Sequence, residues 1–314
     1  MSAPPPAGTP PAPPQPFDAR LLRVRKARAA PGFPTAAFLH ARASADLAER
    51  LEEVPRPFAR ALVLGASAHF RQALAARPAL AARVTILCEA ELAPTLTAPP
   101  RGLAVELERL PFAEGAFDLI VSPLLLHWAN DLPGALIQLR RALAPDGLML
   151  ASLLGGETLM ELRLALIEAE TAARGGASPR VSPFAALADA AALLQRAGFA
   201  LPTADRDRLI VRYRDPARLI ADLRAMGETN ALSARTRRAL TRAEAAHALA
   251  HYSAANAEQD GRARATFDVL TLTGWAPHDS QPKPLRPGSA KARLADALGV
   301  PERSAGEKPG EGGV

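Results

Sequence analysis

The chain has 314 residues, of which 48% are apolar, so it is long enough for one large domain or two smaller ones with a sizeable core. Its formal net charge is +6, but the sequence contains no zinc-finger spacing and no recognisable RNA-binding motif. This argues against a specific nucleic-acid partner. A single cysteine, Cys88, excludes an internal disulfide, and no apolar run reaches the length of about 18 residues that a membrane span needs. We therefore expect a cytoplasmic protein without a secretory signal or a membrane span.

The two ends of the chain differ in composition from its middle. Residues 1–16 hold eight prolines and are expected to form a disordered arm, and residues 281–314, rich in Pro, Lys, Gly and Ser, a disordered tail. Residues 17–57 contain a basic helix candidate and then an amphipathic one over 35–54, which Pro55 ends. Residues 17–57 are thus predicted to be N-terminal helices that precede a larger domain.

Residues 58–156 alternate short apolar runs with helical patterns. The apolar runs are typical of buried strands and lie at 60–65, 83–87, 103–107, 117–122 and 148–154. One of the helices between them has a clear start, because Asp131 is placed to cap it and Pro133 suits its first turn. This alternation predicts an α/β protein with a doubly wound, mostly parallel sheet.

Residues 157–280 are more helical. Helical patterns cover 157–173, 183–197, 216–226 and part of 235–258, and strands are predicted at 208–213 and 265–275. The β-branched alternation of 265–275 fits the reversed edge strand of a mixed sheet. We expect this part of the chain to add helices and the last strands to the same fold.

Three residues at predicted strand ends are candidates for binding a nucleotide-type ligand, because ligands of parallel sheets bind beyond the carboxyl ends of the strands. Gly65 follows the first strand, where a tight turn favours glycine. Glu89 follows the second strand, where a carboxylate can accept hydrogen bonds from ribose hydroxyls. Glu106 closes the third strand, and Ser122–Trp128 lies where the fourth ends.

The sequence resembles the class I S-adenosylmethionine (SAM)-dependent methyltransferases of the type 11 group. The resemblance is carried by ELERLPF at 106–112, FDLIVS at 117–122 and LHWANDLPGALIQLRRALAPDG at 126–147. Within that family it is most similar to the complex I assembly factors of methyltransferase fold and their bacterial relatives, and less so to the methyltransferases that act on malonyl carrier protein. The segments that carry this finer resemblance are LLGGETLMELR at 153–163, SPRVSPFAALAD at 178–189, MGETN at 226–230 and TGWAPHDSQPKPLRPGSA at 273–290.

The resemblance implies a seven-stranded Rossmann-like sheet, with SAM bound within residues 58–156. It implies that Glu89 binds the ribose hydroxyls, that Glu106 faces the adenine amino group and that the Leu107 backbone N–H faces the ring. The remaining site residues that it implies are Gly65, Ala66 and Ser67 in the turn, Ser122 on the methionine side, and His127 and Trp128 on the substrate side. It assigns no catalytic base, and no metal ligands are expected.

The chain departs from the family pattern in the turn after the first strand. The family has an acidic residue and then Gly-x-Gly-x-Gly, whereas here Val63 takes the acidic position, and Ser67 and His69 replace the second and third glycines. A Cβ disfavours positive φ and blocks close backbone approach, so the pattern predicts weaker cofactor binding on an unchanged fold.

Three functions are compatible with these features. The first is methyl transfer from SAM to a protein or a carrier-bound acid. The second, implied by the resemblance, is hydroxylation of an arginine of a respiratory complex I subunit, for which the basic helix at 17–30 is a candidate contact. The third is a non-catalytic assembly scaffold with a degenerate SAM site. Cofactor binding separates the third function from the other two, and the modified product separates the first from the second.

Overall fold

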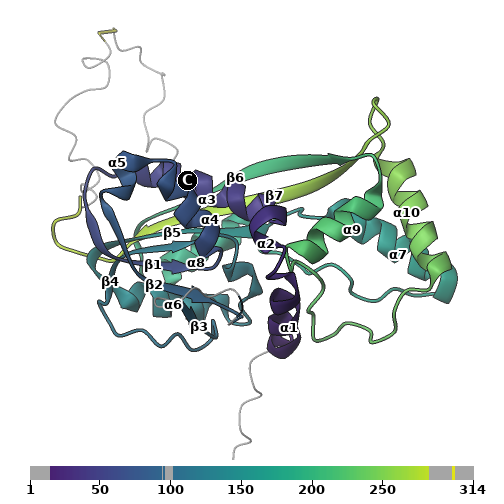
Figure 1. Cartoon of the computed structure of the whole chain (residues 1–314), viewed down its shortest axis with the longest axis horizontal. Coiled ribbons are helices and arrows are strands. Elements are labelled where there is room, and N and C mark those ends of the chain that lie inside the picture. Colours follow the sequence, from purple (N-terminus) through teal and green to yellow (C-terminus); the bar gives the residue numbers. More distant parts are fainter. Residues whose placement is uncertain (1–14, 94, 96–101, 283–298, 301–314) are drawn as a thin grey trace, which may run out of the picture. The chain divides into compact units, whose positions relative to one another are not determined.

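A seven-stranded sheet organises the chain up to His278 (Figure 1). In the computed structural model its strands are β1 (Phe58–Leu64), β2 (Val84–Glu91), β3 (Gly102–Ala104), β4 (Phe117–Ser122), β5 (Leu143–Gly155), β6 (Ala200–Tyr213) and β7 (Ala263–Trp275). Their order across the sheet is β3-β2-β1-β4-β5-β7-β6. The five strands from β3 to β5 pair in parallel, and β7 is antiparallel to both β5 and β6. The α/β class and the doubly wound, mostly parallel seven-stranded sheet are confirmed.

The structure describes residues 15–93, 95, 102–282 and 299–300. The predicted arm at 1–16, apart from its last two residues, and most of the predicted tail at 281–314 lie outside this range. Within it, no helix is both long enough and apolar enough to cross a membrane.

Helices cover both faces of the sheet (Figure 1). They are α1 (Ala19–Ala29), α2 (Phe33–Ala36), α3 (Phe38–Glu52), α4 (Ser67–Ala75), α5 (Pro78–Ala81), the 3-10 helix η2 (Leu126–Trp128), α6 (Leu132–Ala142), α7 (Met160–Arg174), α8 (Leu187–Arg196), α9 (Pro216–Ala225) and α10 (Arg242–Asn256). As predicted, Asp131 caps α6, where its carboxylate accepts a hydrogen bond from the Gly134 N–H at 2.9 Å.

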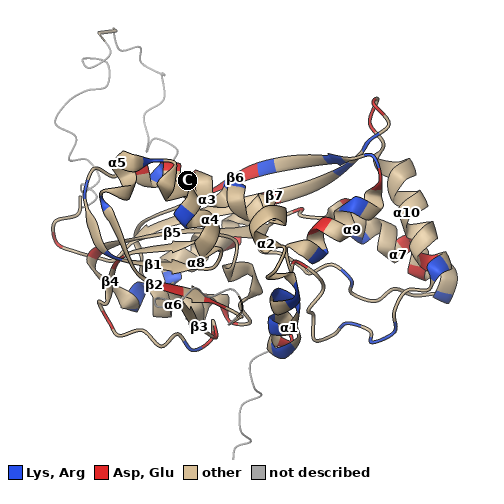
Figure 2. Cartoon of the chain, viewed as in Figure 1, with Lys and Arg blue, Asp and Glu red and all other residues tan. Residues whose placement is uncertain are grey.

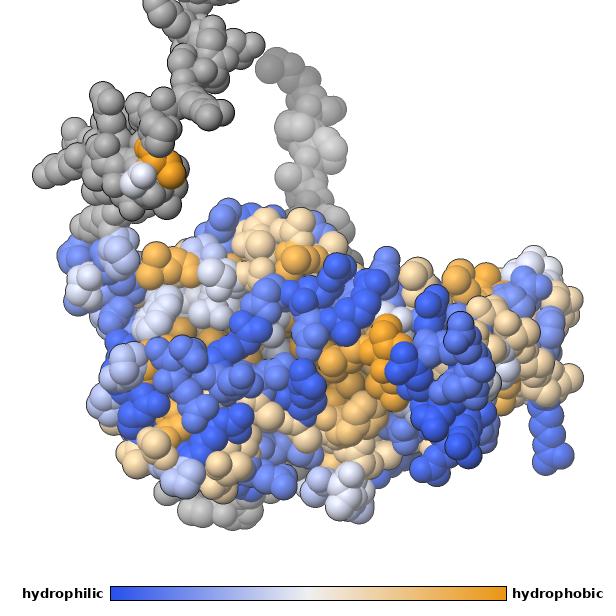
Figure 3. Space-filling view, turned by 90° about the horizontal axis from the view of Figure 1, so that it is seen from above, coloured by the Kyte–Doolittle hydropathy of each residue, from blue (hydrophilic) through white to orange (hydrophobic). Residues whose placement is uncertain are grey.

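Side chains of the central strands alternate between the two faces of the sheet, so each face has its own apolar cluster. Leu62 and Ile120 share one apolar cluster with α6 and α8, whereas Val63 and Val121 share another with α3, α4 and α5. Successive strand residues point to opposite faces, so continuous apolar runs are expected where both faces are covered. A third cluster joins α7, α9 and α10 to the first half of β7. Figure 3 shows hydrophilic residues over much of one face, with a continuous area of apolar residues in its middle.

Several predicted elements differ from those observed. The single helix expected over 35–54 is interrupted at Ala37, where ψ is 56°. The turn expected at 144–147 lies within β5, whose pairing with β4 is irregular there. The strand expected at 208–213 starts already at Ala200. It is β6, not β7, that forms the edge, and β7 is buried between two strands.

Candidate cofactor site and acceptor cavity

The turn after β1 is tight and fully buried. Gly65 has φ +88°, and a Cβ added there would lie 2.8 Å from the Leu125 Cβ, so this position requires glycine for both conformation and space. Ala66 follows with φ 48°, and Ser67 then begins α4. His69 is 4% exposed, and its ring lies 5.1 Å from that of Phe33. The predicted turn residues are therefore together, and α2 and η2 pack against them.

Glu89 lies near the end of β2, beside Val63 of β1. Its side chain is only 3% exposed, and both of its carboxylate oxygens accept hydrogen bonds from Nη1 of Arg71, at 2.6 and 2.5 Å. Arg71 belongs to α4 and remains 44% exposed. The sequence predicted that Glu89 follows a strand that ends at Leu87, whereas β2 continues to Glu91 and Glu89 lies within it; the arginine partner of Glu89 was not predicted.

A second carboxylate, Glu91, ends the same strand and was not singled out from the sequence. One of its oxygens accepts hydrogen bonds from the Ser67 N–H at 3.0 Å and the Ser67 hydroxyl at 3.1 Å. Burial raises the pKa of Glu91 to about 7, although the two bonds from Ser67 favour the charged form. Glu91 thus ties the start of α4 to β2.

Glu106 and Leu107 follow β3, which ends at Ala104 and is shorter than predicted. Leu107 is 2% exposed, whereas the Glu106 side chain is 55% exposed and pairs with Arg23 of α1. Both residues predicted for the adenine side therefore lie just beyond the carboxyl end of β3, and Glu106 contacts α1, a helix that carries several Lys and Arg residues (Figure 2).

The ends of β4 and η2 hold the remaining predicted residues. Ser122 is fully buried, and its hydroxyl makes no hydrogen bond within the described residues. His127 and Trp128 both bind the same oxygen of Glu228, with Nε2 and Nε1 each 3.0 Å from it. Because Nδ1 of His127 accepts from the Leu154 N–H at 3.4 Å, the ring proton belongs on Nε2.

Glu228 is the centre of a buried polar network that sequence reasoning did not find. Its other oxygen lies 2.5 Å from the Lys26 ammonium and 3.4 Å from Nε2 of His40. Burial opposes ionisation, but the Lys26 charge and the hydrogen bond from His127 hold the pKa of Glu228 well below its ordinary value. Burial lowers the pKa of His40 to about 4, so this imidazole is neutral at neutral pH. The only sequence signal was the MGETN segment, which contains Glu228.

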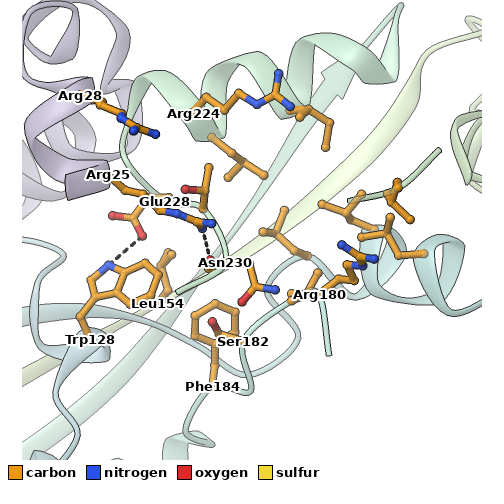
Figure 4. A pocket seen from close by; sticks show the side chains of 18 residues that line it. Arg25, Arg28, Trp128, Leu154, Arg180, Ser182, Phe184, Arg224, Glu228 and Asn230 are labelled. Atoms are coloured by element: carbon orange, nitrogen blue, oxygen red, sulfur yellow. Dashed lines mark hydrogen bonds between the residues drawn. The ribbon is translucent and has the colours of Figure 1, made fainter. Parts of the chain in front are cut away.

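A cavity of about 610 Å³ opens beside Trp128 (Figure 4). Its walls are mainly apolar and include Leu154 of β5, Leu162 of α7 and Leu223 of α9. Four arginines also line it, namely Arg25, Arg28, Arg180 and Arg224.

Two of these four arginines are engaged inside the protein. Arg25 donates to the Asn230 carbonyl, and Arg180 donates to the Glu170 carboxylate at 2.6 Å. Arg28 and Arg224 are exposed and make no ion pair or hydrogen bond within the part of the chain that the structure describes. The described residues also contain no group of three or more His, Cys, Asp or Glu side chains arranged to hold a metal ion.

Comparison with known proteins identifies the family. A methyltransferase domain matches residues 67–151. The chain is 38% identical to arginine-hydroxylase NDUFAF5, mitochondrial, of Danio rerio over 262 residues, which are 82% of this chain and 81% of that protein. It is 37% identical to the Homo sapiens NDUFAF5 over 296 residues, 89% and 82% of the two chains. It is also 33% identical to the malonyl-[acyl-carrier protein] O-methyltransferase of Halorhodospira halophila over 271 residues, 83% and 89% of the two chains.

The chain therefore belongs to the family of methyltransferase-fold proteins that includes these relatives. Among solved structures, the YcgJ protein of Bacillus subtilis superposes with a TM-score of 0.50 at 16% identity, covering 74% of this chain and 98% of that one, which supports the fold. The cofactor that the methyltransferase domain supports is SAM.

The residues at the carboxyl end of the sheet fit the adenosine part of SAM. Glu89 offers a buried carboxylate near the end of β2, and Gly65 provides the tight turn after β1. Ser122, predicted for the methionine side, has a buried hydroxyl that makes no hydrogen bond among the described residues. At the methionine end Val63 and His69 stand where the family has an acid and a glycine, and both are buried by the chain's own side chains. The individual contacts of these residues with SAM remain predictions.

Proposed function

We propose that this protein transfers a methyl group from SAM to an anionic acceptor, a carboxylate carried by a protein or by a carrier-bound acid. The observation that carries the proposal is the cavity beside Trp128, which has apolar walls and two arginines, Arg28 and Arg224, that have no ion-pair partner among the described residues. Guanidinium groups bind carboxylates and phosphates through charge-assisted, often bidentate hydrogen bonds. Apolar walls suit the acyl part of the same acceptor.

The positive charge around this cavity is not balanced internally. Desolvation, together with the charges of Arg235 and Arg28, lowers the pKa of Arg25, which means that another cation is disfavoured there. An acceptor that brings a negative charge relieves this repulsion, whereas a cationic acceptor increases it.

The chemistry asks mainly for positioning from the protein. Bound SAM supplies an electrophilic methyl group on a sulfonium. A carboxylate acceptor is already deprotonated at neutral pH, so the chain needs no general base. The arginines orient the acceptor, and the apolar walls exclude water from the place where the two reactants meet.

A second function has a specific observation in its favour. The chain is 38% identical to the Danio rerio protein named arginine-hydroxylase NDUFAF5 over 82% of its own length, which is more than its identity to the methyltransferase of Halorhodospira halophila. Under this alternative the partner is a respiratory complex I subunit and the modified residue is an arginine, with α1 as the candidate contact.

The products distinguish the two functions. We would incubate the purified chain with SAM labelled in its methyl group and with two acceptors, an acidic carrier protein bearing a dicarboxylic acyl chain and an arginine-containing peptide of a respiratory subunit. The proposal predicts a labelled methyl ester on the acyl chain, lost in Glu89→Gln. An added oxygen on the arginine, without label, would support hydroxylation instead. Failure of the chain to bind SAM at all would favour a non-catalytic scaffold.

We also propose that the protein acts in the cytoplasm. Its single cysteine, Cys88, is a half-buried free thiol, which suits a reducing compartment. Fractionation of cells that express the full chain tests this location.

A further inference from the structure

Both carboxylates predicted to bind the adenosine part of SAM already have an arginine partner. Glu89 pairs with Arg71 of α4, and Glu106 pairs with Arg23 of α1. The two arginines come from different helices and reach the two ends of the same predicted subsite.

The two members of the Glu89–Arg71 pair differ in their access to water. Glu89 is 3% exposed, so without a donor its charge would be buried and unsatisfied. Arg71 is 44% exposed, so it can turn into solvent and remain hydrated. The pair can therefore open by movement of Arg71 alone, provided that another donor, such as two ribose hydroxyls, takes its place on Glu89.

The Glu106–Arg23 pair connects the same subsite to the acceptor cavity. Both side chains are about half exposed, 55% for Glu106 and 42% for Arg23, so water screens the pair and its loss costs little. Arg23 lies on α1, which two and three residues later carries Arg25 of the cavity wall and Lys26 of the Glu228 network. Arg23 therefore shares one short helix with residues around the acceptor cavity.

We propose that Arg71 and Arg23 occupy the cofactor carboxylates in the free protein and are displaced when SAM binds. Arg71 then sets the cofactor affinity, because the ribose must compete with a guanidinium for Glu89. Arg23 makes α1 responsive to the cofactor, because its release removes one contact that holds this helix against the segment after β3. The inference rests on the SAM site described above.

Titration calorimetry of the full chain with SAM tests the role of Arg71. Arg71→Met keeps the aliphatic stem and removes the competitor, so SAM affinity should rise about tenfold, the effect of losing one hydrogen bond to a charged group. Arg77→Met is the matched control, because Arg77 pairs with Glu52 of α3 at 3.3 Å instead of Glu89, and its affinity should equal that of the wild type. An unchanged or weaker affinity of Arg71→Met would overturn the proposal, since it would mean that Arg71 does not compete or binds SAM itself.

Two further measurements test the proposal even if Arg71→Met does not fold. Arg23→Met removes an exposed pair and should fold normally, and its affinity should rise by a smaller factor. In the wild type, SAM should speed hydrogen exchange at the amides of α1; slower or equal exchange would overturn the role of Arg23. If the wild type binds SAM and the variants do not bind it more tightly, only this inference fails. If no form binds SAM, the cofactor site of the proposed function fails with it.

Discussion

At the scale of single residues, Glu91 makes stability depend on pH. Its pKa rises from 4.5 to about 7 in the folded protein because the carboxyl group is buried. Between these two values the folded state keeps a proton that the unfolded state has lost, so stability falls as pH rises through this window. The free energy of unfolding falls by about 3 kcal/mol in total. The fall is complete above about pH 7 and has not begun below about pH 4. Urea unfolding at about pH 5 and about pH 8 measures it.

The control for this prediction is Glu91→Gln, which keeps an oxygen that accepts from Ser67 but does not titrate in this range. The variant should lose less stability than the wild type between the two pH values. If both proteins lose the same amount, Glu91 does not titrate as we expect.

The Lys26–Glu228 pair gives a second prediction at the same scale. The two side chains are 3% and 4% exposed, so removing the cation leaves a buried carboxylate with only His127, Trp128 and His40 around it. Lys26→Met should therefore cost about 3 kcal/mol of unfolding free energy or more. The double variant Lys26→Met/Glu228→Gln should recover part of this, because it removes both charges. A cost below about 1 kcal/mol in the single variant would contradict the prediction.

At the scale of elements, the joint between β5, β6 and β7 depends on one buried carboxylate. Asp268 of β7 is fully buried; it accepts from Nε of Arg208 at 2.7 Å and from the Glu157 N–H at 3.0 Å. Burial alone would raise the pKa of Asp268, but the Arg208 hydrogen bond holds it below its ordinary value. Arg208→Met should destabilise the protein by about 3 kcal/mol, measured by urea unfolding. Arg206→Met is the control and should cost far less, because Arg206 lies 3.9 Å from Asp268.

The strands of the sheet differ in how well the sequence predicts them. The strand β4 was predicted with its observed bounds, because both faces are covered and the run FDLIVS is nearly all apolar. The first half of β6 was missed, because its ADRDR segment looks like a loop. On an edge strand these charged side chains alternate between half-buried and exposed positions, and arginines pair with acids on neighbouring elements. The partners that make such a strand stable lie far away in sequence.

At the scale of the whole molecule, the cofactor residues could be predicted from the sequence, whereas the cavity beside Trp128 could not. The cofactor candidates Gly65, Glu89 and Glu106 could be proposed because each lies near the carboxyl end of a strand, and parallel strands end at one edge of the sheet. The acceptor cavity could not, because its walls come from α1, β5, α7 and α9 and from the segment around Glu228. The arginine partners were also invisible, because Arg71 and Arg23 have no local pattern that names their carboxylates.

The net charge of the molecule provides the last prediction. Arg28→Glu/Arg224→Glu lowers the formal charge from +6 to +2, since each reversal replaces a positive charge with a negative one. If the unpaired arginines at the cavity recognise an acidic acceptor, this variant should weaken binding of the acidic acyl-carrier probe about tenfold or more and reduce its salt dependence. SAM affinity should stay the same, because neither residue contacts the predicted cofactor carboxylates.

The matched control is Arg141→Glu/Arg196→Glu, which makes the same change in net charge on α6 and α8, outside the cavity lining. Local recognition predicts that this control keeps most of the probe affinity, because exposed charges separated by more than about 10 Å are largely screened at moderate salt. An equal loss in both variants would mean that overall charge attracts the probe and that the cavity does not select it. Surface plasmon resonance at several salt concentrations separates the two outcomes, since only direct ion pairing at the cavity makes the two variants differ in salt dependence.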